Sequence, residues 1–163
     1  MPLIESFKAN FQYGVRPNTY LMEIFGLPEK LKFLCKTSQL PGKVIGVIEV
    51  PFHGQKVKLG GDATYEDLTT TILLDNDFSV RNEIESFMSS IRANDSSVGD
   101  EPSLYKQTGS LMQLGPKDEI LAQYDFIGIW PSNLSPIDLG FENNDQIAEY
   151  TVTFSYDYWI RVK

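Results

Sequence analysis

The end of the chain alternates between apolar and polar positions. From Tyr150 to Val162 every even position is apolar, and nearly all the odd positions carry a hydroxyl or a charge. A period of two is typical of a strand with one buried and one wet face. We therefore predict one long strand over 150–162 whose even-numbered side chains, Val162 included, face a core.

Shorter extended segments precede it, each bounded by Gly, Pro or Asn. The segment 43–61 indicates a hairpin that turns near Phe52 to Gly54, and 137–141 is expected to pair with the last strand across Asn143 to Asp145. The other predicted strands are 19–25, 31–40, 65–77, and 104–114 followed by 119–130 around a turn at 115–118.

One segment has a helical period instead. In 78–91 the apolar residues recur at helical spacing, which places them on one face: Val80, Ile84, Phe87, Met88 and Ile91. Asp77 or Ser79 is expected to cap its start. Because only one face is apolar, we expect this helix to lie against a sheet. The polar stretch 93–103 is predicted to be a surface loop.

The predicted elements favour a mainly β chain: an antiparallel sandwich or barrel of about eight strands with one flanking helix. The chain has 163 residues, 42% hydrophobic and 22% charged, which predicts a single domain over 1–163 with its own core. Long, regular strand edges invite pairing with other chains. We expect such pairing to be part of the function.

Charge and targeting signals narrow the function. There are 14 basic and 22 acidic residues, a net charge of 14 − 22 = −8, which argues against a surface that grips nucleic acid or an anionic membrane. The start lacks the basic and apolar regions of a signal peptide, and the longest apolar run, 44–48, is too short to span a bilayer. We expect a protein made and used in soluble form, without membrane insertion.

Candidate chemistry is sparse. The single histidine, His53, lies in a turn, and the single cysteine, Cys35, lies in a strand-like run without a neighbouring histidine to activate it. Acidic residues near Asp62, Asp75 and Asp145 lack calcium-loop spacing and are better explained as turns and caps. We predict no catalytic, cofactor or metal site; a β-fold enzyme that uses Cys35 or the acidic turns is the alternative from another class.

Several stretches together resemble one known family. They are 16-RPNTYLMEI-24, 33-FLCKTSQLPG-42, 49-EVPFHGQKVKLGGDATYEDLTTTILLDND-77, 127-IGIWPSNLSPIDL-139 and 145-DQIAEYTVTFSYDYW-159. In order and length they are similar to the tail tube proteins of T-even-like, contractile-tailed bacteriophages, from about Arg16 to Trp159. The residues that carry the family motifs are Arg16, Pro17, Asn18, Gly61, Asp62, Trp130, Pro131, Tyr156, Asp157, Tyr158 and Trp159. Ala63 and Leu68 depart from the family pattern.

The resemblance implies a structural virion protein. Its fold would be a β-sandwich with a flanking helix and an extended hairpin, shared with type VI secretion tubes. Six copies would form a ring whose inner strands join into one large barrel, and the rings would stack into a hollow tube. The implied partners are the tail sheath, baseplate and terminator proteins, a tape-measure protein inside the tube, and double-stranded DNA in transit. The protein would be made in the host cytoplasm and reside in the virion tail.

Two alternatives have the same fold but belong to a different assembly or take a different place in it. One is the tube of a phage-like injection system of bacteriocin or type VI type; the other is a tube initiator. For a phage tube the acidic charge suits a conduit, because a basic bore would hold DNA by many contacts. The same charge equally suits an exterior that docks basic sheath segments, or a role in solubility alone. The polar, solvent-facing side of the last strand could line either the bore or the exterior of the tube, and the sequence alone leaves both possibilities open.

Contact between rings is assigned to the hairpin over 44–59. Its tip region carries more apolar surface than a turn without a binding role needs. Such apolar side chains on a protruding hairpin would promote aggregation unless another surface covered them. The alternative is that the hairpin packs within its own sandwich. The predicted stacking residues are Ile48, Val50, Pro51, Phe52, His53 and Gln55.

Overall fold

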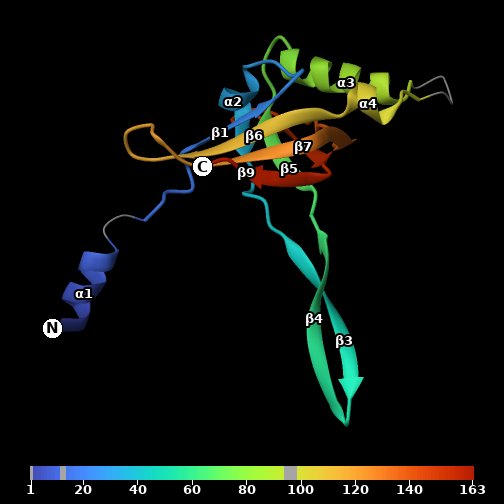
Figure 1. Cartoon of the computed structure of the whole chain (residues 1–163). Helices are drawn as coiled ribbons and strands as arrows, with labels where there is room; N and C mark the ends of the chain where they lie inside the picture. The colour runs from blue at the N-terminus through green and yellow to red at the C-terminus, as the bar shows by residue number, and fades with distance from the viewer. Residues whose placement is uncertain (1, 12–13, 94–98) are drawn as a thin grey trace.

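The structure is a computed structural model that describes residues 2–11, 14–93 and 99–163, with nine strands and four helices in these ranges. Figure 1 shows them along the chain: α1 (Pro2–Asn10), β1 (Tyr20–Ile24), α2 (Leu31–Leu34), β2 (Cys35–Thr37), β3 (Val44–Phe52), β4 (Gln55–Thr64), β5 (Leu68–Leu73), α3 (Ser79–Ile91), α4 (Pro102–Tyr105), β6 (Gln107–Leu114), β7 (Ile120–Leu134), β8 (Glu149–Ser155) and β9 (Tyr158–Arg161).

Seven strands form one antiparallel sheet in the order β1-β6-β7-β8-β5-β2, with β9 added on β7. The long strand β7 joins its two halves, because its first part pairs with β6 and β9 and its last part pairs with β8. The remaining strands, β3 and β4, form a separate hairpin. The predicted mainly β, barrel-like architecture with an extended hairpin is confirmed.

The core lies inside this curved sheet. Alternate positions of β5 and β8 point inward and meet as directly opposed pairs, all of them buried: Leu68 with Phe154, Thr70 with Val152, and Ile72 with Tyr150. Phe126 and Ile129 of β7 complete the same cluster. The period of two seen at the start of the last strand therefore does mark buried positions up to Phe154.

Helix α3 covers one side of the sheet (Figure 1). Val80 and Ile84 are buried in the core cluster, and Met88 packs against it. At the start of the helix the Asp77 carboxylate accepts a hydrogen bond from the Ser79 backbone N–H at 3.0 Å. The helix predicted over 78–91 and its apolar face are confirmed. The N-cap position itself is Phe78, so Asp77 binds the first helical N–H from one residue earlier.

The strand predicted over 31–40 is wrong in its first half. Residues Leu31–Leu34 form the single turn α2, whose backbone bonds include Leu34 N–H to the Lys30 carbonyl at 3.2 Å. This turn delivers both Leu31 and Cys35 into the core, four residues apart. A strand would have placed Leu34 on the opposite face from Leu31 and Cys35, whereas the helical turn brings all three to the core side, where Leu34 packs against the cluster.

The last strand is interrupted, and its predicted facing is wrong beyond the break. Strand β8 ends at Ser155, β9 resumes at Tyr158, and the side chains of Tyr158, Ile160 and Val162 are 43%, 48% and 57% exposed. In the paired strand β7 the buried side chains shift from an even-numbered position, Phe126, to an odd-numbered one, Ile129. Gly128, which has a φ of 71°, lies between them. The inward positions beyond the kink are therefore odd-numbered, and Trp159 packs against the core.

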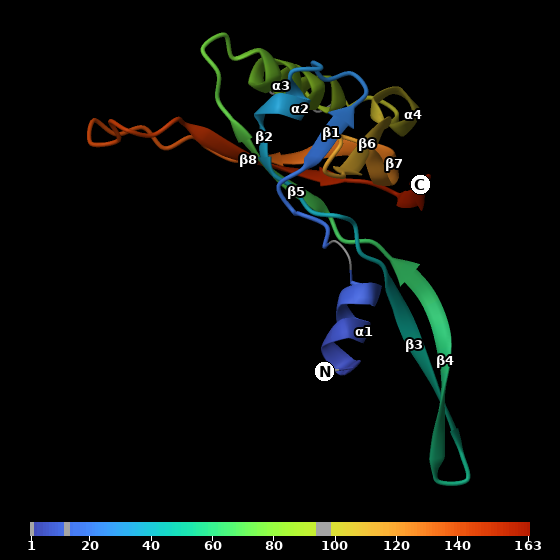
Figure 2. The same ribbon diagram turned by 90° about the vertical axis from the view of Figure 1, so that its left-hand side faces the viewer.

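The predicted pairing of 137–141 with the last strand is also wrong. Residues 135–148 form no strand and extend away from the body (Figure 2). The partner of β8 is the end of β7, with Trp130 opposite Ser155 and Leu134 opposite Val152. The motif residues Trp130 and Pro131 consequently lie inside β7, before a bulge that follows Pro131.

Of the loop predicted over 93–103, residues 94–98 lie outside the described ranges, and α4 begins at Pro102. Within the described part of the chain, no helix has the length and apolar character needed to cross a membrane.

Candidate assembly surface

The hairpin of β3 and β4 projects from the body as a separate arm (Figures 1 and 2). Phe52 pairs with Gln55, which leaves His53 and Gly54 as a two-residue turn with φ values of 47° and 81°. Positive φ at both central positions is the geometry that matches the twist of a two-residue hairpin. The turn predicted near Phe52 to Gly54 is confirmed.

The two faces of the arm differ in chemistry. Ile48 lies opposite Leu59 and Val50 opposite Val57, and Phe52 continues the same face. These five side chains are 44–66% exposed. The other face carries Lys56, Lys58 and Glu49, with an ion pair of 2.9 Å between Lys56 and Glu49. We call the first set, Ile48, Val50, Phe52, Val57 and Leu59, the apolar face of the hairpin.

The predicted stacking residues divide between these surfaces. Ile48, Val50 and Phe52 lie on the apolar face, and Pro51 lies on the charged face opposite Lys56. His53 and Gln55 are at the tip, where the His53 ring stands edge-on to Phe52 with 4.2 Å between centroids. Because every one of these residues is exposed, the alternative that the hairpin packs within its own sandwich is wrong.

A bulge shapes the base of the arm. Ile45 pairs with Ala63 and Val47 with Gly60, so Gly61 and Asp62 together oppose the single residue Gly46. A side-chain carbon on Gly61 would stand 3.1 Å from the Gly46 carbonyl oxygen, tighter than ordinary contact. The motif glycine at 61 is explained by this close backbone approach.

Aromatic residues from the end of the chain hold both legs of the arm. The Trp159 indole N–H donates to the Gly42 carbonyl at 2.9 Å on the first leg. On the second leg the Tyr65 ring lies 6.4 Å from Trp159 and 6.3 Å from Tyr156, and the Ser155 hydroxyl donates to Asp67 at 2.9 Å. The motif residues Tyr156 and Trp159 thus fix the direction in which the hairpin leaves the body.

The remaining motif residues have separate structural contacts and form no common site. The Arg16 carbonyl accepts from the Gln113 side chain at 2.8 Å, and Pro17 and Asn18 form the turn before β1. Trp130 stands edge-on to Tyr105 at 5.8 Å. Asp157 accepts from Lys106 at 2.7 Å, while Tyr158 is exposed on β9.

The candidate nucleophile and base are not brought together. Cys35 is buried in β2, and this burial raises the pKa of its thiol to about 11, so the thiolate is scarce at neutral pH. His53 lies at the tip of the projecting arm (Figure 1). Among the residues that the structure describes, no three His, Cys, Asp or Glu side chains cluster closely enough to hold a metal ion.

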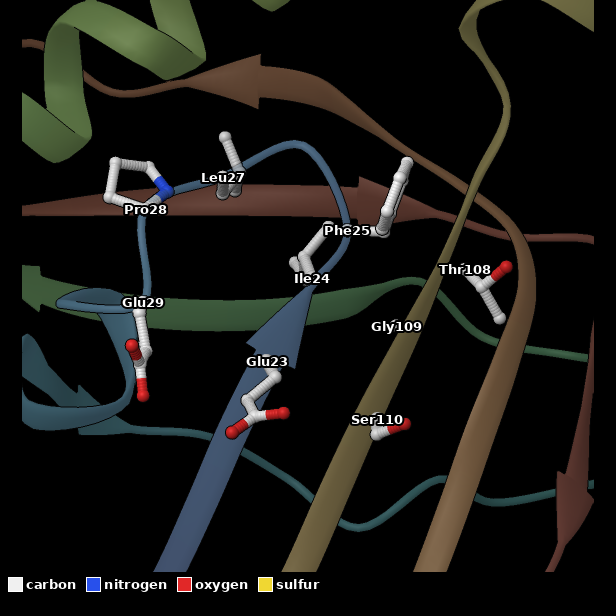
Figure 3. Close-up of a pocket in the computed structure, with 9 residues that line it drawn as sticks. All are labelled: Glu23, Ile24, Phe25, Leu27, Pro28, Glu29, Thr108, Gly109 and Ser110. Carbon is white, nitrogen blue, oxygen red and sulfur yellow. The ribbon is translucent and has the colours of Figure 1, made fainter.

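A hollow of about 430 Å³ lies between β1, the turn after it and β6 (Figure 3). Two carboxylates, Glu23 and Glu29, lie at its rim, and both are within ion-pair reach of Lys32. Carboxylates neutralised by a lysine do not make the acid and base pair of a hydrolytic site. The residue types that line this hollow give no chemical role to it.

Helix α1 was not predicted from the sequence. It stands clear of the body (Figure 1). The apolar side chains Leu3, Ile4 and Phe7 within it, and Phe11 directly after it, are 83%, 54%, 62% and 57% exposed. The signal was present as the spacing of Leu3, Phe7 and Phe11, at i, i+4 and i+8. It was overlooked because a helix this short has little stability alone.

The chain is similar in sequence to known phage tail tube proteins. Tail tube protein gp19 of Enterobacteria phage T4 is 28% identical, over 96% of this chain and 98% of that protein. The tail tube protein of Serratia phage KSP90 is 25% identical, over 76% of this chain and 70% of that protein.

Solved structures share the fold. A chain of the sheath–tube complex of an extracellular contractile injection system, PVC, has a TM-score of 0.72 at 16% identity, covering 96% of this chain and 95% of that one. A chain of the sheath/tube terminator of the same system reaches 0.74 at 15% identity, covering 94% and 99%. Residues 4–162 match the family model described as phage tail tube protein. Since this match spans almost the whole chain, the protein belongs to the phage tail tube family.

Proposed function

We propose that copies of this chain form six-membered rings that stack, through the β3–β4 hairpin, into the hollow inner tube of a contractile phage tail. The single observation that carries the stacking role is the apolar face of the hairpin, with its five side chains 44–66% exposed. A two-stranded hairpin is marginal by itself in water, and such a face is stable only when covered. The whole chain acts as one tube domain in this proposal.

The hairpin is suited to reach another ring because it is both long and fixed in direction. Strands β3 and β4 extend nine and ten residues, and the contacts of Trp159 and Tyr65 hold its base. Its charged face carries alternating signs in Glu49, Lys56 and Lys58, which favours one register over others at a polar contact. The hairpin thus combines affinity from one face with specificity from the other.

We propose the tail sheath on the outside of the tube, baseplate and terminator proteins at its ends, and a tape-measure protein within it. The fold is shared with chains solved in a sheath–tube complex, a sheath/tube terminator and a baseplate, which supports these partner classes. The relatives from phages T4 and KSP90 favour a phage tail over an injection system or a tube initiator. Synthesis and assembly would take place in the host cytoplasm, with a structural role in the virion tail and no catalytic step.

We propose that DNA passes through the tube without being held. The outward face of β5 and β8 is lined largely by hydroxyl side chains, with Thr69 opposite Thr153 and Thr71 opposite Thr151. This largely hydroxyl wall belongs to a chain of net charge −8, and the nearby Lys36 is already paired with Glu149 at 2.6 Å, so the wall offers DNA few of the cationic contacts that would retain it. We assign this face to the bore. Tubes of Thr69→Lys, Thr153→Lys subunits should retain DNA fragments in a sedimentation assay, whereas unmodified tubes should not.

Negative-stain electron microscopy of the purified chain tests the stacking role. The unmodified chain should form rings or tubes, on concentration or after addition of a tube fragment as seed. Val50→Asp with Val57→Asp should abolish stacking while leaving the circular dichroism melt unchanged, because both side chains are exposed in the single chain. Lys117→Ser, at an exposed position in the turn between β6 and β7 and outside the hairpin, is the matched control and should still form tubes. An unmodified chain that forms neither rings nor tubes with a seed would overturn the proposal.

A further inference from the structure

We infer that the helix α1 of one copy packs across the apolar face of the hairpin of a second copy, so that each subunit interface contains a helix laid on a two-stranded sheet. This inference rests on the proposed function, because it requires the copies to assemble. It names what covers the apolar face and also explains the free helix.

Helix α1 has an apolar stripe that no other described part of its own chain covers. Leu3, Ile4, Phe7 and Phe11 fall within about 100° of the helix circumference at 100° per residue. Phe7 and Phe11 stack at 5.4 Å between ring centroids, and the Phe11 N–H donates to the Phe7 carbonyl at 2.8 Å. Glu5 and Ala9 lie on the other side of the helix. A nine-residue helix is marginal in water unless its apolar face is packed.

The apolar stripe of α1 and the apolar face of the hairpin match in size. From Leu3 to Phe11 the helical rise covers about 12 Å, at 1.5 Å per residue. From Ile48 to Phe52 the apolar face of the hairpin covers about 13 Å, at 3.3 Å per residue. A helix on one face of a sheet is a standard way for both to bury their apolar sides.

Both views show α1 and the hairpin projecting from the same side of the body, and Figure 1 shows them apart from each other. Neighbouring copies in one ring, related by rotation about the tube axis, would therefore present the helix of one beside the hairpin of the next. Helix and hairpin would then enter the contact with the adjacent ring as one unit. Each copy supplies one helix and one hairpin, so a head-to-tail ring uses every one of them.

Cross-linking in trans between two differently tagged chains tests this inference. One chain carries Phe7→Cys, at the middle of the α1 stripe, and the other carries Val57→Cys, at the middle of the apolar face of the hairpin. Because both positions are central, they lie close together whether the helix runs parallel or antiparallel to the strands of the hairpin. Both are doped at a low fraction into unmodified chain so that assembly depends on intact subunits. Cys35 is buried and serves as an internal background in every sample.

In assembled tubes, mild oxidation should give a dimer carrying both tags, because a disulfide needs its Cβ atoms within about 4.5 Å. The matched control pairs Ala9→Cys, on the opposite side of α1, with Lys56→Cys, on the charged face of the hairpin, and should cross-link several-fold less. If Phe7→Cys chains are not incorporated, Lys8→Cys leaves the stripe whole and is used with a short bis-maleimide.

Tubes that contain both tagged chains but cross-link the central pair no better than the control pair would overturn the inference, and would leave α1 to another partner such as the sheath. A chain carrying both Phe7→Cys and Val57→Cys that closes on itself as a monomer, before assembly, would also overturn it in favour of an intrachain contact. Failure of the unmodified chain to form rings or tubes would instead count against the proposed function. Microscopy and cross-linking therefore separate the two failures.

Discussion

The carboxylate of Asp157 occupies the space that a side-chain carbon on Gly128 would need. Gly128 has a φ of 71°, and Asp157 is held in place by Lys106, whose Nζ donates to its carboxylate at 2.7 Å and 3.0 Å. The Asp157 N–H donates to the Ile127 carbonyl at 2.9 Å. The kink in β7 and the break between β8 and β9 are thus one feature, made by a glycine within β7 and an aspartate within the break.

Gly128→Ala should lower the free energy of unfolding by about 1–3 kcal/mol, because alanine is strained at positive φ and its methyl group would displace Asp157. Urea denaturation measures this change. Gly42→Ala is the matched control: no atom lies within 4 Å of its added carbon, and its stability should stay within about 0.5 kcal/mol of the parent. Equal stability of the two variants would show that the kink does not depend on glycine.

Trp159→Phe should loosen the base of the hairpin without unfolding the body. The substitution keeps an aromatic ring and removes the N–H that donates to the Gly42 carbonyl at 2.9 Å, a bond worth about 1 kcal/mol. Hydrogen exchange should become faster in β3 and β4 and remain unchanged in β8. Trp130→Phe, on the Tyr105 side of the molecule, should leave exchange in the hairpin as it is. Equal protection of the hairpin in both variants would contradict the anchoring role of Trp159.

Ile84→Ala should destabilise the body by about 2–5 kcal/mol, because the side chain is fully buried between α3 and the sheet and its loss leaves a cavity. Val57→Ala on the hairpin, where the side chain is 51% exposed, should change stability by no more than about 0.5 kcal/mol. Both are measured by urea denaturation of the monomer. A large loss for Val57→Ala would mean that the hairpin already packs within the single chain.

Stability should fall at alkaline pH. Burial raises the pKa of Cys35 from 9.0 to about 11, and burial likewise raises the pKa of Tyr20 and of Tyr150 from 10.0 to about 12. Between the unfolded and the folded pKa values, the unfolded chain loses protons that the folded chain keeps. The contribution of these groups to the free energy of unfolding is therefore fully present below pH 9 and decreases as the pH rises toward 12. Denaturation midpoints from pH 8 to 11.5 test this, and Cys35→Ala should reduce the loss between pH 9 and 11. A flat profile across that range would contradict the assignment.

Much of the architecture could be predicted from local patterns. The spacing of Val80, Ile84 and Met88 predicted α3 and its buried face, and His53 with Gly54 predicted the hairpin turn, because both signals depend on residues close in sequence. The candidate site was found for the same reason, since the apolar residues at 48, 50 and 52 share one face of any strand. The family motifs located the same region, through Gly61 and Asp62 at its bulge.

The wrong sequence predictions share one physical cause. Alternation of apolar and polar residues shows that a strand has two different faces, but it does not show which part of the chain covers each face. Tyr158 and Ile160 continue the pattern of Val152 and Phe154, yet they are exposed, because Gly128 and Asp157 change the phase of the sheet from across the strand pair. Leu31 and Cys35 were assigned to a strand because their burial by a single helical turn depends on the distant core. The partner of β8 was misassigned since β7, more than a dozen residues away, outcompeted the nearer segment 137–141.

The sequence by itself determined the mainly β character, the flanking helix, the acidic charge and the place of the chain in its family, because these follow from composition, periodicity and motifs. Only the tertiary structure decided which apolar residues are left outside. The stripe of α1 and the apolar face of the hairpin are as apolar as the core strands, and no local signal separates them from it. The sheet closes on Phe126, Phe154 and their neighbours and leaves these two surfaces projecting from one side, because a closed core has no room for them.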